Sequence, residues 1–221
     1  MAVVSLVIAR YNEKLNWLIK SNIVHRDLTI YVYNKGNDDL VFLNAYPNVI
    51  VRRLENVGRE GHTYYTHIVK HYNHLSSFII FLQGEPFPHV FNAIERINQC
   101  VNYAIHWARA KQNLTTQYFH PIGEGLLYTH TRYTPFHRGL PLHRIVQFLF
   151  DIDYVGRIPF VSGAQFMVHK EIVHTRDVAF YSRIVDLLSI SIDPLEGYAI
   201  ERLHLPIFNL FSFRVNSLNN Q

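Results

Sequence analysis

Four short apolar runs separated by helical patterns most constrain the fold of this chain. They occupy residues 3–9, 28–33, 49–54 and 78–82, and the last reads Phe-Ile-Ile-Phe-Leu without a polar residue. A run with no polar face is typical of a strand covered on both sides, as in the parallel sheets of α/β proteins. Strands and helices that alternate at this spacing indicate right-handed crossovers. The sequence therefore predicts an α/β fold whose central, mostly parallel mixed sheet is flanked by helices.

Further elements follow from the same patterns. Helices are predicted at residues 15–20, 62–72 and 90–111, and a mainly helical stretch at 170–188. Residues 112–141 are expected to be rich in loops, 160–168 to form a strand that runs antiparallel, and 198–208 to begin as a helix that Pro206 interrupts. No linker composition divides the chain, so we expect one domain over residues 1–221.

Composition narrows the class of protein. A chain of 221 residues with 48% hydrophobic content is long enough to bury a proper core. Its one cysteine, Cys100, excludes an internal disulfide and a cysteine zinc site, and fits a reducing compartment. The net charge of +4 is scattered, which suits a small anionic ligand at least as well as nucleic acid, and we expect no nucleic-acid partner. Without an export signal or an apolar stretch of about 20 residues, we expect a soluble, cytoplasmic protein.

Polar clusters follow each of the four predicted strands. They contain Arg10, Asn12 and Glu13; Asn34 and Lys35; Asn56, Arg59 and Glu60; and Gln83 and Glu85. Ligands of parallel sheets bind beyond the carboxyl ends of the strands, so these clusters should converge. Gly58 permits close approach of the backbone, and a helix that begins near His62 offers free N–H groups to phosphate. Lys35 or Arg59 would neutralise a diphosphate, and Glu85 is a candidate ligand for Mg²⁺ or Mn²⁺.

The order of these segments resembles the GT-A glycosyltransferases, especially the inverting family that includes cellulose and hyaluronan synthases. The first strand runs into Arg10-Tyr11-Asn12-Glu13, the second into an acidic turn, and Asn56-Val57-Gly58 precedes a helix. Gln83-Gly84-Glu85 takes the place of the metal-binding Asp-x-Asp, with Gln83 in place of the first aspartate. Gly163-Ala164-Gln165-Phe166 is similar to the acceptor-side Gly-Ala strand of those enzymes, and the segment 195–203 to their helix with the catalytic base.

A more specific similarity is to a family of proteins of unknown function found in fungi, plants, bacteria and large DNA viruses. Its motifs stand here between residues 9 and 203: Ala-Arg-Tyr-Asn-Glu, Tyr-Asn-Lys-Gly, Asn-x-Gly-Arg-Glu-x-x-Thr-Tyr, Phe-Leu-Gln-Gly-x-Pro, Gly-Ala-Gln-Phe and Pro-Leu-Glu-Gly-Tyr. For a viral member, the expected location is the host cytoplasm.

The glycosyltransferase resemblance implies a GT-A-like domain with a nucleotide-sugar half, residues 1–90, and an acceptor half, residues 91–221. It implies transfer of a sugar, from a UDP-sugar by preference, to a glycan or other hydroxyl acceptor with the help of Mn²⁺ or Mg²⁺. The implied donor-binding residues are Ala9, Arg10, Tyr11, Asn12, Glu13, Asn34, Lys35, Asn56, Gly58, Arg59, His62, Gln83, Gly84 and Gln165. The metal is held by Glu85 alone, by Glu85 with a distant partner such as His204, or is absent.

A carboxylate on the acceptor side would serve as the base of an inverting transfer. Glu196 is the first candidate and Glu201 the second, while a carboxylate that merely stabilises a helix N-terminus is the structural alternative for Glu196.

Three other patterns compete with this interpretation. His67, His71 and His74 share one helical face, as the ligands of a metal-dependent hydrolase would, although an exposed imidazole face explains them better. Asp151-Ile152-Asp153 is a literal Asp-x-Asp, but it does not follow the fourth strand, and we expect it to be a decoy; Asp38-Asp39 reads as a solvated turn. The Tyr- and His-rich residues 117–143 suit a non-catalytic carbohydrate- or nucleotide-binding module, or an acceptor wall.

Overall fold

A computed structural model of the chain describes residues 2–110, 118–123, 125–134 and 136–213. Its strands are β1 (Val4–Arg10), β2 (Thr29–Asn34), β3 (Val49–Arg53), β4 (Phe78–Gln83), β5 (Phe119–Pro121), β6 (Leu127–His130), β7 (Arg157–Phe160) and β8 (Phe166–His169). Its α-helices are α1 (Asn16–Lys20), α2 (Arg59–His71), α3 (Ala93–Arg109), α4 (Leu142–Phe150), α5 (Lys170–Val173), α6 (Val178–Leu188), α7 (Leu195–Arg202) and α8 (His204–Ile207). Short 3-10 helices are η1 (Ile23–His25), η2 (Val41–Ala45), η3 (Tyr72–His74) and η4 (Phe87–His89).

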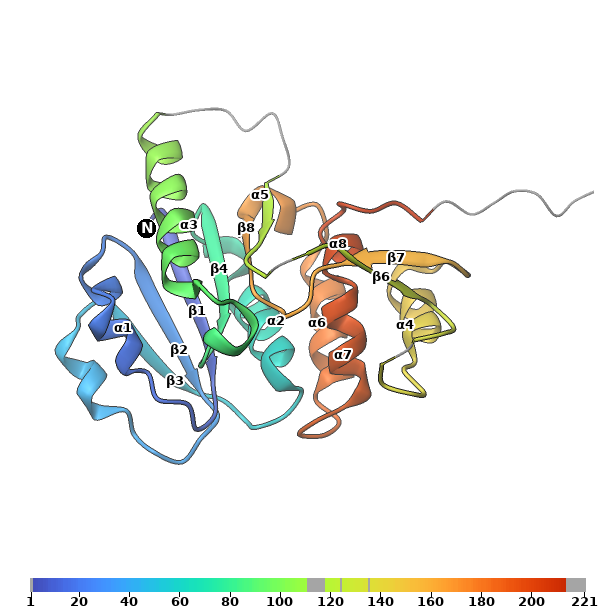
Figure 1. Ribbon diagram of the computed structural model, residues 1–221, viewed down its shortest axis with the longest axis horizontal. Helices are drawn as coiled ribbons and strands as arrows, with labels where there is room; N and C mark the ends of the chain where they lie inside the picture. The colour runs from blue at the N-terminus through green and yellow to red at the C-terminus, as the bar shows by residue number, and fades with distance from the viewer. Residues whose placement is uncertain (1, 111–117, 124, 135, 214–221) are drawn as a thin grey trace, which may run out of the picture.

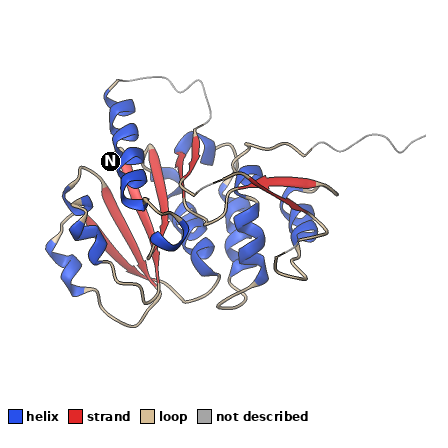
Figure 2. Cartoon of the chain, viewed as in Figure 1, coloured by secondary structure: helices blue, strands red, loops and turns tan. Residues whose placement is uncertain are grey.

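The central sheet is six-stranded, in the order β3-β2-β1-β4-β8-β5 (Figure 1). Strands β1 to β4 pair in parallel, and β8 runs antiparallel to both β4 and β5. The predicted mostly parallel mixed sheet is therefore confirmed, as is the antiparallel direction of its late strand. A separate two-stranded antiparallel sheet of β6 and β7 lies at the far end of the molecule beside α4 (Figure 2).

Alternate residues of the central strands pack into two hydrophobic cores, one on each face of the sheet. Val7, Ile79 and Phe81 pack with α2, α4, α6, α7 and α8 on one face. Leu6 and Ile8 pack with α1 and α3 on the other. The sheet is thus buried on both faces, which explains why its strands read as unbroken apolar runs. In the described part of the chain, no helix is long and apolar enough to cross a membrane.

The prediction of one strand over residues 160–168 is wrong. β7 ends at Phe160 and β8 begins at Phe166, and the two belong to different sheets. Gly163 (φ 98°) and Ala164 (φ 49°) lie in the left-handed region, so the intervening Gly-Ala-Gln segment is a turn. Pro206 does not interrupt a helix: it lies inside α8, and the break falls at Leu203.

The region predicted to be loop-rich, residues 112–141, contains two strands, β5 and β6. Residues 111–117, 124 and 135 lie outside the described parts, and with them the last residue of the helix predicted at 90–111. The described helix there, α3, starts three residues later than predicted and runs to Arg109.

Candidate functional site

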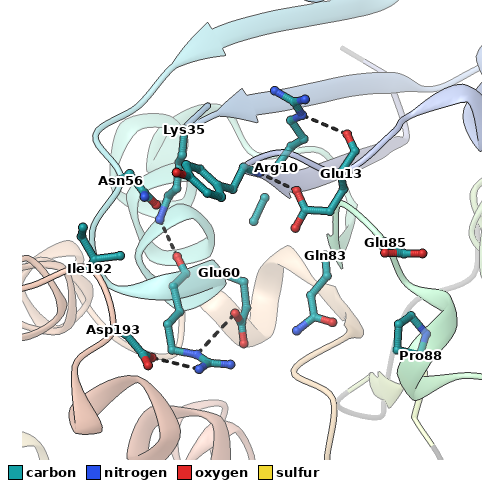
Figure 3. A pocket seen from close by; sticks show the side chains of 13 residues that line it. Arg10, Glu13, Lys35, Asn56, Glu60, Gln83, Glu85, Pro88, Ile192 and Asp193 are labelled. Atoms are coloured by element: carbon teal, nitrogen blue, oxygen red, sulfur yellow. Dashed lines mark hydrogen bonds and ion pairs between the residues drawn. The ribbon is translucent and has the colours of Figure 1, made fainter. Parts of the chain in front are cut away.

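A pocket of about 410 Å³ opens at the carboxyl ends of β1, β2 and β4 (Figure 3). The strand register brings its walls together, because Arg10 pairs with Asn34 across β1 and β2, and Ala9 pairs with Gln83 across β1 and β4. The lining residues are Ala9, Arg10, Tyr11, Glu13, Lys35, Asn56, Arg59, Glu60, Gln83, Glu85, Pro88, Ile192 and Asp193. Most of them come from the polar clusters that follow the predicted strands.

Arg10 ties the loops after β1 and β2 together. Its buried guanidinium forms an ion pair with Asp38 and donates to the Asn34 side-chain oxygen at 2.8 Å. Its Nε donates to the Glu13 carbonyl oxygen at 3.0 Å. The hydrogen bond from Arg10 lowers the pKa of Asp38. Asp38 lies in an exposed turn, as expected, and in addition forms an ion pair with Arg10. Arg10 is therefore largely committed to holding the pocket's shape.

Lys35 pins the loop between β3 and α2. Its buried ammonium donates to the carbonyl oxygens of Val57, at 2.6 Å, and of Arg59. Burial lowers the pKa of Lys35 to about 8, and the nearby Glu60 carboxylate opposes that shift. The ammonium thus lies at the pocket wall with part of its donor capacity already used.

Arg59 crosses the opposite side of the pocket. Both Gly58 (φ 63°) and Arg59 (φ 53°) are left-handed, which turns the chain sharply into α2. The Arg59 guanidinium donates to Asp193 at 3.0 Å and lies 4.0 Å from the centre of the Tyr198 ring. The Gly58 N–H donates to the Ser191 carbonyl at 2.8 Å, so the α6–α7 loop is held against this wall.

The end of β4 forms the floor and outer rim. The Trp17 indole donates to the Gly84 carbonyl at 2.9 Å, which fixes the turn between Gln83 and Glu85. A side chain at position 84 would meet the Glu13 carboxylate at 2.8 Å, so Glu13 would have to move to admit one. In Figure 3 the Gln83 amide points into the pocket and Glu85 lies near Pro88. Glu85 is exposed and has no hydrogen-bond or ion-pair partner among the described residues.

Other predicted donor residues support the walls instead of lining them. Asn34 is buried and accepts from Gly36 N–H as well as from Arg10. His62 is buried in the first turns of α2, and burial lowers its pKa to about 4. Asn12 is exposed. None of these three residues lines the pocket.

Gln165, Glu201 and His204 line a second, much smaller cavity beside β8. The Gln165 amide donates to the Pro86 carbonyl at 3.2 Å, and one Glu201 oxygen accepts from Gly163 N–H at 2.8 Å. Burial raises the pKa of Glu201, and the Glu60 carboxylate of the first pocket adds to that effect. Burial lowers the pKa of His204 to about 3.

The structure does not bring Glu85 and His204 to one cavity. Glu85 lines the first pocket and His204 the second. Among the residues that the structure describes, no three His, Cys, Asp or Glu side chains are grouped closely enough to hold a metal ion by themselves. Glu196 lies in the first turn of α7, three residues after the pocket residue Asp193.

The expectation that His67, His71 and His74 form an exposed face is wrong: His67 and His71 lie in α2 and His74 in η3. His67 is buried, and its Nδ1 lies 3.0 Å from the Tyr33 hydroxyl in a hydrogen bond. The ring centres of His67 and His71 are 4.5 Å apart, and both rings pack on Tyr31. His67 is therefore part of the core, and the exposed His74 is the outermost of the three.

The literal Asp-x-Asp lies outside both cavities. Asp151 ends α4 in a left-handed conformation, and Asp153 pairs with His143 at 2.7 Å.

Pocket residues that the sequence reasoning did not assign are Pro88, Ile192 and Asp193, whereas Glu60 was named in a polar cluster but not among the donor-binding residues. Pro88 closely follows the Gln-Gly-Glu segment, and this proximity was the signal that could have identified it. Ile192 and Asp193 come from the distant α6–α7 loop, and no local pattern distinguishes them.

These features define an α/β protein with a polar pocket at the carboxyl edge of its parallel strands. The chain belongs to the family described as "Protein of unknown function (DUF3431)", whose family model matches residues 6–121. That match extends from β1 to β5 and includes every pocket segment except the α6–α7 loop. No curated protein and no solved structure matches the chain.

Proposed function

We propose that this protein is a glycosyltransferase that moves a sugar from a nucleotide-diphosphate donor, with UDP-sugars favoured, to a glycan or other hydroxyl acceptor. One observation carries the proposal: separate segments that resemble the donor site of GT-A enzymes line a single pocket. Its place at the carboxyl edge of parallel strands is where such sheets bind ligands. The antiparallel β8 beside β4 also agrees with the mixed GT-A-like sheet that the resemblance implies.

The charge balance of the pocket supports a role for a divalent cation. Arg10, Lys35 and Arg59 already bind oxygen atoms of the protein. The lining also carries the carboxylates of Glu13, Glu60, Glu85 and Asp193. A diphosphate would therefore enter a pocket whose cations are occupied, next to several negative charges.

Glu85 would hold Mn²⁺ or Mg²⁺ there, because these ions bind through one or two carboxylates together with substrate phosphates. Its unpaired carboxylate on the rim fits that role, and the adjacent Gln83 amide offers a further oxygen or a hydrogen bond to the sugar or ribose. The metal would supply charge stabilisation to the leaving diphosphate.

Glu201 is the better supported of the two candidate bases. Its raised pKa suits a group that must accept a proton, and only one of its oxygens is bound by Gly163. The Glu60 carboxylate, which lines the donor pocket, adds to the rise in the pKa of Glu201, and this supports a role for Glu201 near the donor. Glu196, on the first turn of the same helix, remains the alternative.

Calorimetric titration with UDP, GDP and CMP, each with and without Mn²⁺, tests the proposal. We expect one nucleotide diphosphate to bind, more tightly with Mn²⁺. Glu85→Ala should remove the metal-dependent part, and Gln83→Ala should weaken binding by about 0.5–1.5 kcal/mol, as for one neutral hydrogen bond. Asp153→Ala is the control, since it removes a carboxylate that lies outside the pocket.

The opposite pattern, in which Asp153→Ala abolishes nucleotide binding and Glu85→Ala leaves it unchanged, would show that the donor site is wrongly placed. Failure of every nucleotide to bind, together with tight zinc binding lost in His71→Ala, would instead favour a metal-dependent hydrolase. Selective nucleotide binding with no sugar transfer to any acceptor would favour a binding module.

A further inference from the structure

A third hollow, at the surface, is lined by residues of the loop between β6 and α4. That loop lies beside α4 at the lower right of Figure 1. The hollow measures about 460 Å³ and is lined by Arg132, Tyr133, Thr134, Arg138, Gly139 and Leu140. The proposed donor pocket contains none of these residues. The hollow is therefore a separate feature that the proposed chemistry has not used.

The two arginines of the hollow differ from those of the donor pocket. Arg10 is paired with Asp38 and Arg59 with Asp193, whereas the guanidinium groups of Arg132 and Arg138 have no hydrogen-bond or ion-pair partner among the described residues. Residues 125–150 contain no Asp or Glu at all. Two unpaired guanidinium groups in an open hollow present planar forks that suit carboxylate or phosphate oxygens.

The loop that carries Arg138 is held in a defined shape. His137 (φ 63°) and Gly139 (φ 81°) are both left-handed, and a side chain at position 139 would meet no atom within 4 Å. Glycine is needed there for its backbone conformation and not for space. His137 also stacks on Tyr198 at 3.9 Å and accepts from Arg202 at 3.3 Å. These contacts anchor the turn that presents Arg138.

The same stack connects the hollow with the donor pocket. Tyr198 lies between the His137 ring and the Arg59 guanidinium, which is 4.0 Å from the centre of the tyrosine ring. Since Arg59 lines the donor pocket, the two sites lie on either side of one aromatic side chain of α7. An extended molecule in the hollow would lie beside the place where the donor is held.

One exposed aromatic ring lines the hollow together with the arginines, that of Tyr133, which is 73% exposed. A flat, exposed ring offers an apolar face on which a sugar ring can stack, and the arginines beside it can bind the acidic group of the same sugar.

We propose that the Arg132–Arg138 hollow binds an acidic glycan, through its carboxylate groups, as the acceptor of the transfer. The assignment as acceptor rests on the proposed glycosyltransferase function, whereas the binding site itself does not. Arg132 and Arg138 supply the anion contacts, and Tyr133 supplies a stacking face.

The test uses a galacturonic acid hexamer as the probe and its fully methyl-esterified form as the neutral counterpart, titrated by calorimetry into the full chain without nucleotide. We expect the acidic hexamer to bind and the ester to bind at least tenfold more weakly. Arg132→Ala/Arg138→Ala should lose at least tenfold in affinity for the acidic hexamer. The matched control Arg144→Ala/Arg183→Ala removes two exposed arginines outside the hollow and should change the affinity less than twofold.

Equal losses in both double variants would mean that the affinity reflects net charge alone and would overturn the proposal. Equal binding of acid and ester, or no binding of the acidic hexamer at millimolar concentration, would overturn it as well. Nucleotide titrations on the same variants keep the two proposals apart. If nucleotides fail to bind while the hexamer behaves as expected, the glycan site stands and the transferase proposal fails. If nucleotides bind normally while Arg132→Ala/Arg138→Ala leaves the affinity for the hexamer unchanged, the glycan site fails and the transferase proposal stands.

Discussion

The fold should lose stability steeply as the pH falls from 6.5 to 5, because several histidines are buried in their neutral form. Burial is the largest cause that lowers the pKa of each: to about 4 for His62 and His169, and to about 3 for His67 and His204. In the unfolded chain the same groups titrate near 6.5. Between these values the unfolded chain binds more protons than the folded one, so acid favours unfolding.

The size of the effect follows from that difference. At pH 5 a histidine that stays neutral in the folded state and has an unfolded pKa near 6.5 costs about 2 kcal/mol relative to neutral pH. The four together would remove about 8 kcal/mol, which is comparable to the roughly 5–15 kcal/mol of a typical domain. Glu201 acts in the opposite sense, because burial raises its pKa and the folded state takes up its proton first. One carboxylate offsets only part of the loss.

Urea denaturation followed by far-UV circular dichroism at pH 7.5, 6.5, 5.5 and 5.0 measures this loss. His204→Leu removes one titrating ring of the core, so its stability at pH 5 should fall by about 2 kcal/mol less than that of the native chain. His74→Gln, at an exposed position, should follow the native curve. A denaturation midpoint that stays constant from pH 7.5 to 5.0 would refute the buried, neutral state of these histidines.

Three shorter predictions concern the pocket walls. Gly58→Ala should destabilise the fold in thermal unfolding by more than the roughly 1–2 kcal/mol of a left-handed alanine, because its side chain would also meet the last turn of α6 at 2.5 Å. The control is Gly125→Ala in the same assay: Gly125 is also left-handed but has no atom within 4 Å of the added side chain, so this variant measures the conformational cost alone. Trp17→Phe removes the indole donor to the turn after β4. It should lower the free energy of nucleotide binding, measured by calorimetry, by more than it lowers the free energy of unfolding, measured by thermal unfolding. Asp193→Asn removes one of the two ion-pair partners of Arg59 and leaves Glu60, so metal-free UDP should bind a few-fold more tightly in low salt and lose that gain in 0.5 M NaCl. An unchanged affinity would mean that Arg59 does not face the diphosphate.

The convergence of the strand ends could be predicted because each strand is recognisable from its local sequence. A run such as residues 78–82 is apolar on both faces, which requires helices on both sides of a parallel sheet, and parallel strands end at one edge. The residues that follow the strands must then meet there. Arg10, Lys35 and Gln83 line one pocket for this reason.

What the sequence did not reveal depends on distant contacts or on backbone conformation. Asp193 reaches Arg59 across 134 residues of chain, and the ion pair of Asp38 with Arg10 was missed because Arg10 lies on another strand. The turn between β7 and β8 was missed because Ala164 adopts a left-handed conformation that alanine rarely takes. In α2, spacing alone could not show that His67 packs under the sheet, since a core face and a metal-binding face share the same helical period.

The distribution of paired and unpaired charges is the strongest link between the fold and the proposed chemistry. At the carboxyl edge of the sheet, each arginine or lysine of the pocket is held by protein oxygen atoms, and this fixes the loops but leaves little free positive charge. Glu85 is the exception among the acids, since its carboxylate on the rim is without a partner in the described chain. A rigid pocket with committed cations and one free carboxylate recruits a divalent ion more readily than a bare anion. Beyond Tyr198 the pattern reverses, because Arg132 and Arg138 have no ion-pair partner among the described residues and no acidic residue lies within 125–150. The two proposals thus assign different partners to the two sites: a phosphate group accompanied by a metal ion on one side of Tyr198, and an acidic sugar bound directly on the other.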